Sequence, residues 1–190
     1  MFVGRKKELD ALNSRYKSNR KEFGVLYGRR RIGKSSILNE FLKDKKGILF
    51  QAKQDNSYGN LKSFSYEVDH LLNLPDTFVF ASWQHAFKSI QEYAKNERFV
   101  LVIDEYPYIV SQDSSFSSVL QEFIDHASDN MMVILSGSNI GFLQKEIQNH
   151  ASPLYKRRTF EMEIKKMNFM DAKEFVKMED VESQANYLCL

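Results

Sequence analysis

Residues 23–41 read FGVLYGRRRIGKSSILNEF, an apolar run followed by a basic loop between Gly28 and Gly33 and then by a helix-like repeat. The loop satisfies G-x-x-x-x-G-K-[ST] in the strand–loop–helix setting that this pattern requires, so it predicts a phosphate-binding loop. Glycine lets the backbone wrap a phosphate, with N–H groups and the positive end of the helix directed at the anion. We expect Lys34 to reach the β and γ phosphates of a nucleotide and the Ser35 hydroxyl to hold Mg²⁺. The predicted nucleotide-binding residues are Gly28, Arg29, Arg30, Arg31, Ile32, Gly33, Lys34, Ser35 and Ser36.

A second informative stretch is FVLVI, residues 99–103, which Asp104 and Glu105 follow directly. A continuous apolar run of this length is typical of a strand in the middle of a parallel sheet. Open α/β sheets bind ligands at the carboxyl ends of their strands, so the two acids are expected beside the phosphate loop. Asp104 would orient Mg²⁺, and Glu105 would polarise the water that attacks the γ-phosphate. The alternative is that both acids cap the strand in solvent.

A further buried strand is predicted at residues 131–135, with Ser138 and Asn139 shortly after its carboxyl end. A polar side chain there is placed to hydrogen-bond the γ-phosphate or the attacking water, and Ser138 is the catalytic candidate. Serine and asparagine are also preferred helix caps, so both residues are equally well explained as caps of a helix that begins at Ile140.

Residues 153–164 read PLYKRRTFEMEI, a basic turn followed by an alternating strand. An arginine such as Arg157 or Arg158 can neutralise charge on a transferred phosphoryl group, in its own subunit or in a neighbour's. Ordinary exposed ion pairs with Glu161 and Glu163 explain the same residues. Both interpretations remain open at this point.

The remaining elements follow from periodicity and capping residues. Trp83 follows Ser82, a predicted N-cap, and its helical spacing to later apolar residues indicates a core anchor. Arg5 belongs to a segment that either covers one edge of the sheet or lies beside the nucleotide base. The other expected elements are a helix ending at Tyr16, a strand at 47–53, a helix from Asn60 to near Pro75, a helix capped by Ser114 or Ser115, and a last helix capped by Asn168.

Composition excludes several classes of protein. The 190 residues are 43% hydrophobic, enough for one packed domain, and 27 basic residues nearly balance 25 acidic ones, so the charge does not indicate nucleic acid. The only cysteine, Cys189, excludes an internal disulfide. The sequence shows neither a membrane-spanning run nor a secretory start, and we expect a cytoplasmic protein without membrane association.

These motifs together resemble the archaeal-type P-loop ATPase family, close to the AAA+ and STAND ATPases. The resemblance covers about residues 2–176. It rests on FVGR-x-x-EL near the start, the G-x-R-R-x-G-K-[ST] loop, the strand ending in DE with a nearby Pro-Tyr, a G-S after the fourth strand, and P-L-Y-x-R-R.

The resemblance implies an α/β fold, a three-layer P-loop NTPase sandwich with a parallel sheet of about five strands, of the additional-strand type found in AAA+ and RecA-like proteins. The strand after the acidic one is then inserted beside the first. ATP and Mg²⁺ are the implied ligands. Residues 1–165 would form the ATPase core, and residues 166–190 would begin a truncated helical lid region.

Three functions are compatible with these residues. The first is an ATPase that hydrolyses the β–γ bond, coupled to a protein partner or a homo-oligomer. The second is a nucleotide-gated STAND-like switch with negligible turnover, and the third is a DNA-associated ATPase. A GTPase is not indicated, because no N-K-x-D motif for guanine is found. Glu105 favours hydrolysis over the chemistry of a small-molecule kinase, which does not need an acid there.

Overall fold

The computed structural model describes residues 4–72, 75 and 78–167. The expected helix capped by Asn168 lies outside the described residues, as does nearly all of the expected lid region. The strands are β1 (Glu22–Tyr27), β2 (Gly47–Gln51), β3 (Phe99–Asp104), β4 (Met131–Gly137) and β5 (Phe160–Glu163). The helices are α1 (Lys6–Tyr16), α2 (Lys34–Leu42), α3 (Ser57–Leu72), α4 (Trp83–Tyr93), α5 (Pro107–Gln112), α6 (Phe116–His126) and α7 (Ile140–Gln148).

The five strands of the described residues form one parallel sheet in the order β2-β3-β4-β1-β5. Strand β4 follows the acidic strand β3 in the chain and lies between β3 and β1, which confirms the predicted fold class and strand order. β1, β3 and β4 are buried along their whole length, as expected of central strands with helices on both faces. Their carboxyl ends therefore meet at one edge of the sheet.

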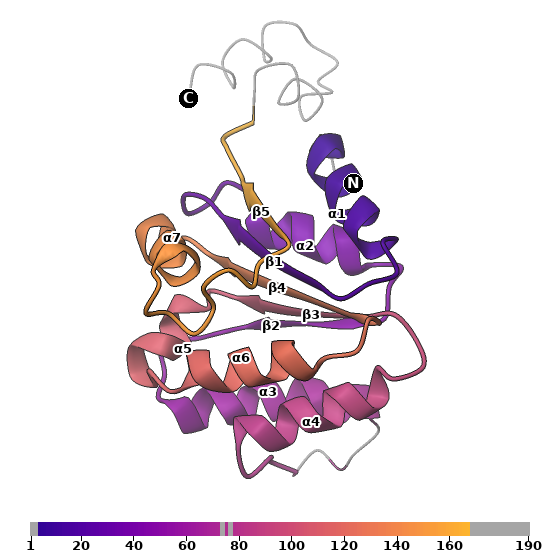
Figure 1. Ribbon diagram of the computed structural model, residues 1–190, viewed down its shortest axis with the longest axis vertical. Helices are drawn as coiled ribbons and strands as arrows, with labels where there is room; N and C mark the ends of the chain where they lie inside the picture. The colour runs from indigo at the N-terminus through magenta and orange to yellow at the C-terminus, as the bar shows by residue number, and fades with distance from the viewer. Residues whose placement is uncertain (1–3, 73–74, 76–77, 168–190) are drawn as a thin grey trace, which may run out of the picture.

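Helices cover both faces of the sheet and complete a three-layer sandwich (Figure 1). On one face, Leu12 of α1 and Ile37 of α2 pack against apolar side chains of β1, β3 and β4. On the other face, α3, α4, α6 and α7 pack against the alternate side chains of the same strands. Successive side chains of each strand point to opposite faces of the sheet, so each of these strands contributes to two separate hydrophobic cores.

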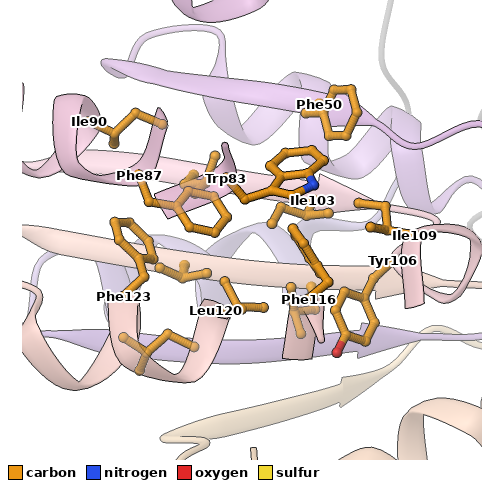
Figure 2. Packing of buried hydrophobic residues seen from close by; sticks show 14 of the residues in the cluster. Phe50, Trp83, Phe87, Ile90, Ile103, Tyr106, Ile109, Phe116, Leu120 and Phe123 are labelled. Carbon is orange, nitrogen blue, oxygen red and sulfur yellow. The ribbon is translucent and has the colours of Figure 1, made fainter. Parts of the chain in front are cut away.

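The larger core is built around Trp83, which is 5% exposed and lies among aromatic rings from β2, α4 and α6 (Figure 2). Its ring centroid lies 4.8 Å from that of Phe116 and 6.1 Å from that of Phe50. Such edge-to-face and tilted pairs contribute beyond the area that they bury. The prediction that Trp83 is a core anchor is confirmed.

Local capping was predicted with mixed success. Ser82 accepts a hydrogen bond from the His85 N–H and caps α4, as predicted. Ser115 occupies the N-cap position of α6, but its side chain does not cap the helix. Asp113 Oδ1 accepts from both the N–H and the hydroxyl of Ser115, at 3.1 and 2.5 Å, so the Ser115 hydroxyl is engaged outside the helix. The short helix α5, with Pro107 in its first turn, was not predicted. No helix in the described part of the chain is long and apolar enough to cross a bilayer.

Candidate nucleotide-binding site

The loop from Gly28 to Gly33 connects β1 to α2 and has the backbone that the motif predicts. A Cβ on Gly28 would lie 2.3 Å from the Ile164 carbonyl oxygen, so a larger residue there must displace the chain beyond β5. Gly33 is the N-cap of α2 and has φ 92° and ψ 21°, a left-handed conformation that glycine adopts without strain. Both glycines therefore have a physical reason to be glycine.

Lys34 folds back over this loop from the first turn of α2. Its Nζ donates to the carbonyl oxygens of Gly28 at 2.9 Å and Arg29 at 3.0 Å, and the residue is only 6% exposed. Burial lowers the pKa of Lys34, and the nearby carboxylates of Glu105 and Asp104 oppose that shift. An ammonium group held over the loop by two backbone carbonyls is positioned to receive an anionic ligand bound in that loop.

Ser35 and Asp104 meet at the base of the loop. Ser35 Oγ donates to Asp104 Oδ2 at 2.5 Å, and Asp104 Oδ1 accepts from the Glu105 N–H at 3.0 Å. Asp104 is 1% exposed, so this carboxylate is fixed by hydrogen bonds and by packing. A hydroxyl and a carboxylate oxygen are the hard ligands that Mg²⁺ prefers beside nucleotide phosphates, so these two residues fit the predicted ion.

Glu105 is brought to the same place from the end of β3. Together with Lys34, Ser35 and other residues of the phosphate loop, it lines a hollow of about 450 Å³. Its Oε2 accepts from the N–H of Ser138 at 3.2 Å and from Ser138 Oγ at 3.0 Å. The structure thus joins the predicted base, the loop and the predicted Ser138 at one edge of the sheet.

Backbone conformations of positive φ gather at this site. Glu105 has φ 52° and Arg31 has φ 63°, in addition to Gly33. For a residue other than glycine, this left-handed backbone conformation costs roughly 1 kcal/mol, and it persists only where the surrounding structure enforces it. The left-handed conformation of Glu105 turns the chain directly after the buried strand, and its side chain lines the hollow beside the loop.

Of the two polar candidates after β4, only Ser138 contacts Glu105 among the described contacts. The Asn139 side chain accepts from the Phe142 N–H at 3.1 Å and caps α7, as the capping alternative predicted. Ser138 therefore remains the candidate from this turn.

Arg157 and Arg158 are not brought to the phosphate loop. They precede β5 and lie at the edge of the sheet where the strands begin. Arg157 pairs with Asp125 through Nε and Nη2 at 2.8 and 2.9 Å. Arg158 pairs with Glu161 at 2.8 Å, as the ion-pair alternative predicted. Neither arginine is placed to act in its own subunit's site, and a role at a neighbour's site stays a proposal.

The structure adds residues that sequence reasoning did not connect to the loop. Arg5 is 7% exposed, and its Nη2 donates to the Ile32 carbonyl oxygen at 2.8 Å. This hydrogen bond braces the end of the phosphate loop that precedes α2. Behind Glu105, the buried Tyr106 hydroxyl hydrogen-bonds with Ser117 and donates to Glu146. Burial raises the pKa of Tyr106, so the hydroxyl stays protonated as a donor. The FVGR-x-x-EL motif was the available signal for Arg5, but it does not identify the partner.

The strand order, the glycine loop and the acidic strand together define a P-loop NTPase with a nucleotide-binding ATPase fold. Residues 2–187 match the family model described as an ATPase domain predominantly from Archaea. The chain belongs to this family of ATPase domains, as the sequence motifs had indicated.

The chain is similar to several known proteins. A protein of Methanocaldococcus jannaschii is 29% identical over 177 residues, which are 92% of this chain and 38% of that protein. A second protein of that organism, named as ATP-binding, is 46% identical over 46 residues, 24% of this chain and 78% of that protein. The structure of Aeropyrum pernix ORC2 in ADPNP–ADP complexes is similar at a TM-score of 0.61 and 16% identity, covering 96% of this chain and 51% of that one. The last likeness concerns the fold alone. The chain spans well under half of the first relative and about half of ORC2.

Proposed function

We propose that this chain binds ATP with Mg²⁺ and hydrolyses the bond between the β and γ phosphates. Membership in a family of ATPase domains supports this proposal. The observation that carries it is the position of Glu105, which lines one hollow with Lys34 and Ser35 of the phosphate loop. A general base must lie where the attacking water lies, and that is beside the γ-phosphate.

Each group has one task in the proposed reaction. The loop N–H groups and Lys34 bind the phosphates, and Lys34 exchanges its bonds to loop carbonyls for bonds to phosphate oxygens. Ser35 and Asp104 would hold Mg²⁺, which when bound supplies positive charge to the β and γ oxygens. Glu105 orients a water molecule and accepts its proton as the water oxygen bonds to the γ-phosphorus. The bond to the bridging oxygen breaks, and ADP leaves with the electron pair.

The test is phosphate release from saturating Mg-ATP by the wild-type chain, Glu105→Gln and Lys34→Ala. Glutamine keeps the size of the side chain and an acceptor for Ser138 but cannot take a proton. We expect Glu105→Gln to bind ATP and lose about 100-fold or more in rate, and Lys34→Ala to lose binding. A wild-type rate that Glu105→Gln retains in full would contradict the assignment of the base.

A nucleotide-gated switch is the second candidate, and one observation favours it. Both the N–H and the hydroxyl of Ser138 already donate to Glu105 Oε2, so the carboxylate is engaged before it meets a water molecule. A switch predicts ATP binding that depends on Lys34, with no phosphate release in either the wild type or Glu105→Gln. Hydrolysis that depends on Glu105 would exclude this candidate.

The partner that couples to ATP is proposed to be a protein or a second copy of the chain. The nearly balanced charge favours this over nucleic acid. Size-exclusion chromatography with and without Mg-ATP tests self-association. An affinity for DNA that falls steeply with salt would favour the DNA-associated alternative instead.

A further inference from the structure

The phosphate-loop motif does not require an arginine at its third position, yet Arg30 makes specific contacts there. Its Nη2 donates to the Tyr108 hydroxyl at 2.6 Å, and its Nε approaches Ser138 Oγ at 3.5 Å. Tyr108 belongs to α5, directly after the acidic strand, and Ser138 directly follows β4. The guanidinium therefore reaches across the mouth of the site to the side where Glu105 lies.

Arg30 shares its surroundings with the proposed catalytic groups. It lines the 450 Å³ hollow together with Lys34, Ser35 and Glu105. Its contact Ser138 is also the residue that donates twice to Glu105. Arg30 and Lys34 bring two cations to this hollow, where Glu105 supplies a carboxylate, so an anionic ligand is favoured there.

The neighbouring arginine of the same loop lies on the other side. Arg29 lines a separate hollow of about 260 Å³ with Ile140, Glu163 and Lys165. The loop thus distributes its charges, with Arg30 on the side of Glu105 and Arg29 on the side of β5. Arg157 and Arg158, at the opposite edge of the sheet, are engaged in ion pairs.

We propose that Arg30 is a catalytic residue that contacts the γ-phosphate, and that Tyr108 is the positioning residue that holds Arg30 on that side. The proposal rests on the ATPase function proposed above. Arg30 neutralises the charge that accumulates on the γ-phosphate oxygens as the bond to the bridging oxygen breaks, and it exchanges no proton. In this proposal the phosphate loop itself supplies the arginine that stabilises the transition state.

The experiment measures the affinities of the full chain for Mg-ADPNP and Mg-ADP by calorimetry, and phosphate release from Mg-ATP. Arg30→Ala is expected to lower the affinity for Mg-ADPNP roughly tenfold or more. The affinity for Mg-ADP should change less than about twofold. Phosphate release should fall about 100-fold or more. Arg30→Lys should recover part of both losses, because the charge remains without the planar fork.

Arg29→Ala is the matched control, since it removes the same charge from the same loop. It should lower the affinities for ADPNP and ADP by equal factors, so that the ratio of the two affinities stays at the wild-type value. Tyr108→Phe tests the positioning role. It should lower the ratio of the ADPNP affinity to the ADP affinity less than Arg30→Ala does. In the double variant with Arg30→Ala, it should have no further effect on that ratio, because the Tyr108 hydroxyl acts through the Arg30 guanidinium.

Equal weakening of both nucleotides by Arg30→Ala would overturn the proposal, because Arg30 would then be only a charge of the loop. If the wild type hydrolyses ATP in a Glu105-dependent manner and Arg30→Ala does so equally fast, the catalytic role fails while the ATPase function stands. If the wild type shows no such hydrolysis, the ATPase function and the catalytic role fail together. Thermal unfolding of each variant separates these results from loss of fold.

Discussion

Replacement of Arg5 by alanine tests whether a residue outside the motif organises the phosphate loop. Arg5 lies at the start of α1, and its guanidinium is almost fully buried between two partners. Nη2 donates to the Ile32 carbonyl oxygen at 2.8 Å, and Nη1 pairs with Glu8 at 2.9 Å. Alanine removes both contacts and leaves a loop carbonyl without its charged donor. Both residues carry a Cβ, so the left-handed φ of 60° costs the same in each.

The size of the effect follows from these two contacts. A hydrogen bond from a charged donor contributes about 1.5–3 kcal/mol, and the partly exposed pair with Glu8 adds about 0.5 kcal/mol. We therefore expect Arg5→Ala to reduce the free energy of unfolding by about 2–3.5 kcal/mol and the melting temperature by about 4–14 °C. Because the lost bond ends on the phosphate loop, ADPNP and ADP should both bind about tenfold more weakly.

Two assays and one control separate an effect on the phosphate loop from a loss of overall stability. Denaturant unfolding gives the free energy, and calorimetry at a temperature where both chains are folded gives the nucleotide affinities. Glu8→Gln removes the ion pair but keeps the bond from Arg5 to Ile32, so it should leave affinity within about twofold of wild type. A destabilised Arg5→Ala that binds both nucleotides as tightly as wild type would refute the bracing role and leave Arg5 as an anchor of α1.

Three further changes test other parts of the site and fold. Ser138→Ala removes one of two donors to Glu105 and should slow phosphate release about tenfold while ADPNP affinity stays within about threefold; unchanged release would exclude Ser138. Tyr106→Phe removes the buried hydroxyl from Ser117 and Glu146 and should cost about 1–2 kcal/mol in urea unfolding; a neutral result would mean that the pair of Ser117 and Glu146 suffices. The hydrogen bonds from Arg157 lower the pKa of Asp125 below its unfolded value, so the pair stabilises the fold above about pH 4 and loses this effect as pH falls through the folded pKa. Asp125→Asn should cost about 0.5 kcal/mol at pH 7 because the pair is partly exposed, with a cost that shrinks below about pH 4; a cost independent of pH would contradict the ionic origin.

Features of short sequence range were predictable from the chain alone. Residues 23–41 specify a strand, a glycine loop and a helix in direct succession, so no distant contact is needed to recognise them. The same holds for FVLVI followed by Asp104 and Glu105, because a continuous apolar run can only be a buried element. Parallel pairing then places both stretches at one edge of the sheet, and the residues of the predicted loop and acidic strand do meet there.

Contacts between distant residues were not predictable, because sequence shows the kind of side chain and not its direction. Arg5 and Ile32 are 27 positions apart, and Arg30 and Tyr108 are 78 apart. Arg157 was attractive as a catalytic charge because it belongs to a basic turn. Its partner Asp125 lies 32 positions away on helix α6, and nothing in the local pattern indicates it. Ser115 misled for a local reason, since its hydroxyl donates to Asp113 instead of capping the helix.

The position of the basic turn before β5, and not its composition, decides what its arginines do. In a sheet whose strands are all parallel, residues that precede a strand lie at the edge opposite to residues that follow one. Arg157 and Arg158 precede β5, whereas the phosphate loop, Glu105 and Ser138 each follow a strand. An arginine side chain is too short to reach from one end of β5 to the other. Arg30 follows β1, so it lies at the same edge as Glu105 and Ser138, and its guanidinium approaches Ser138 there.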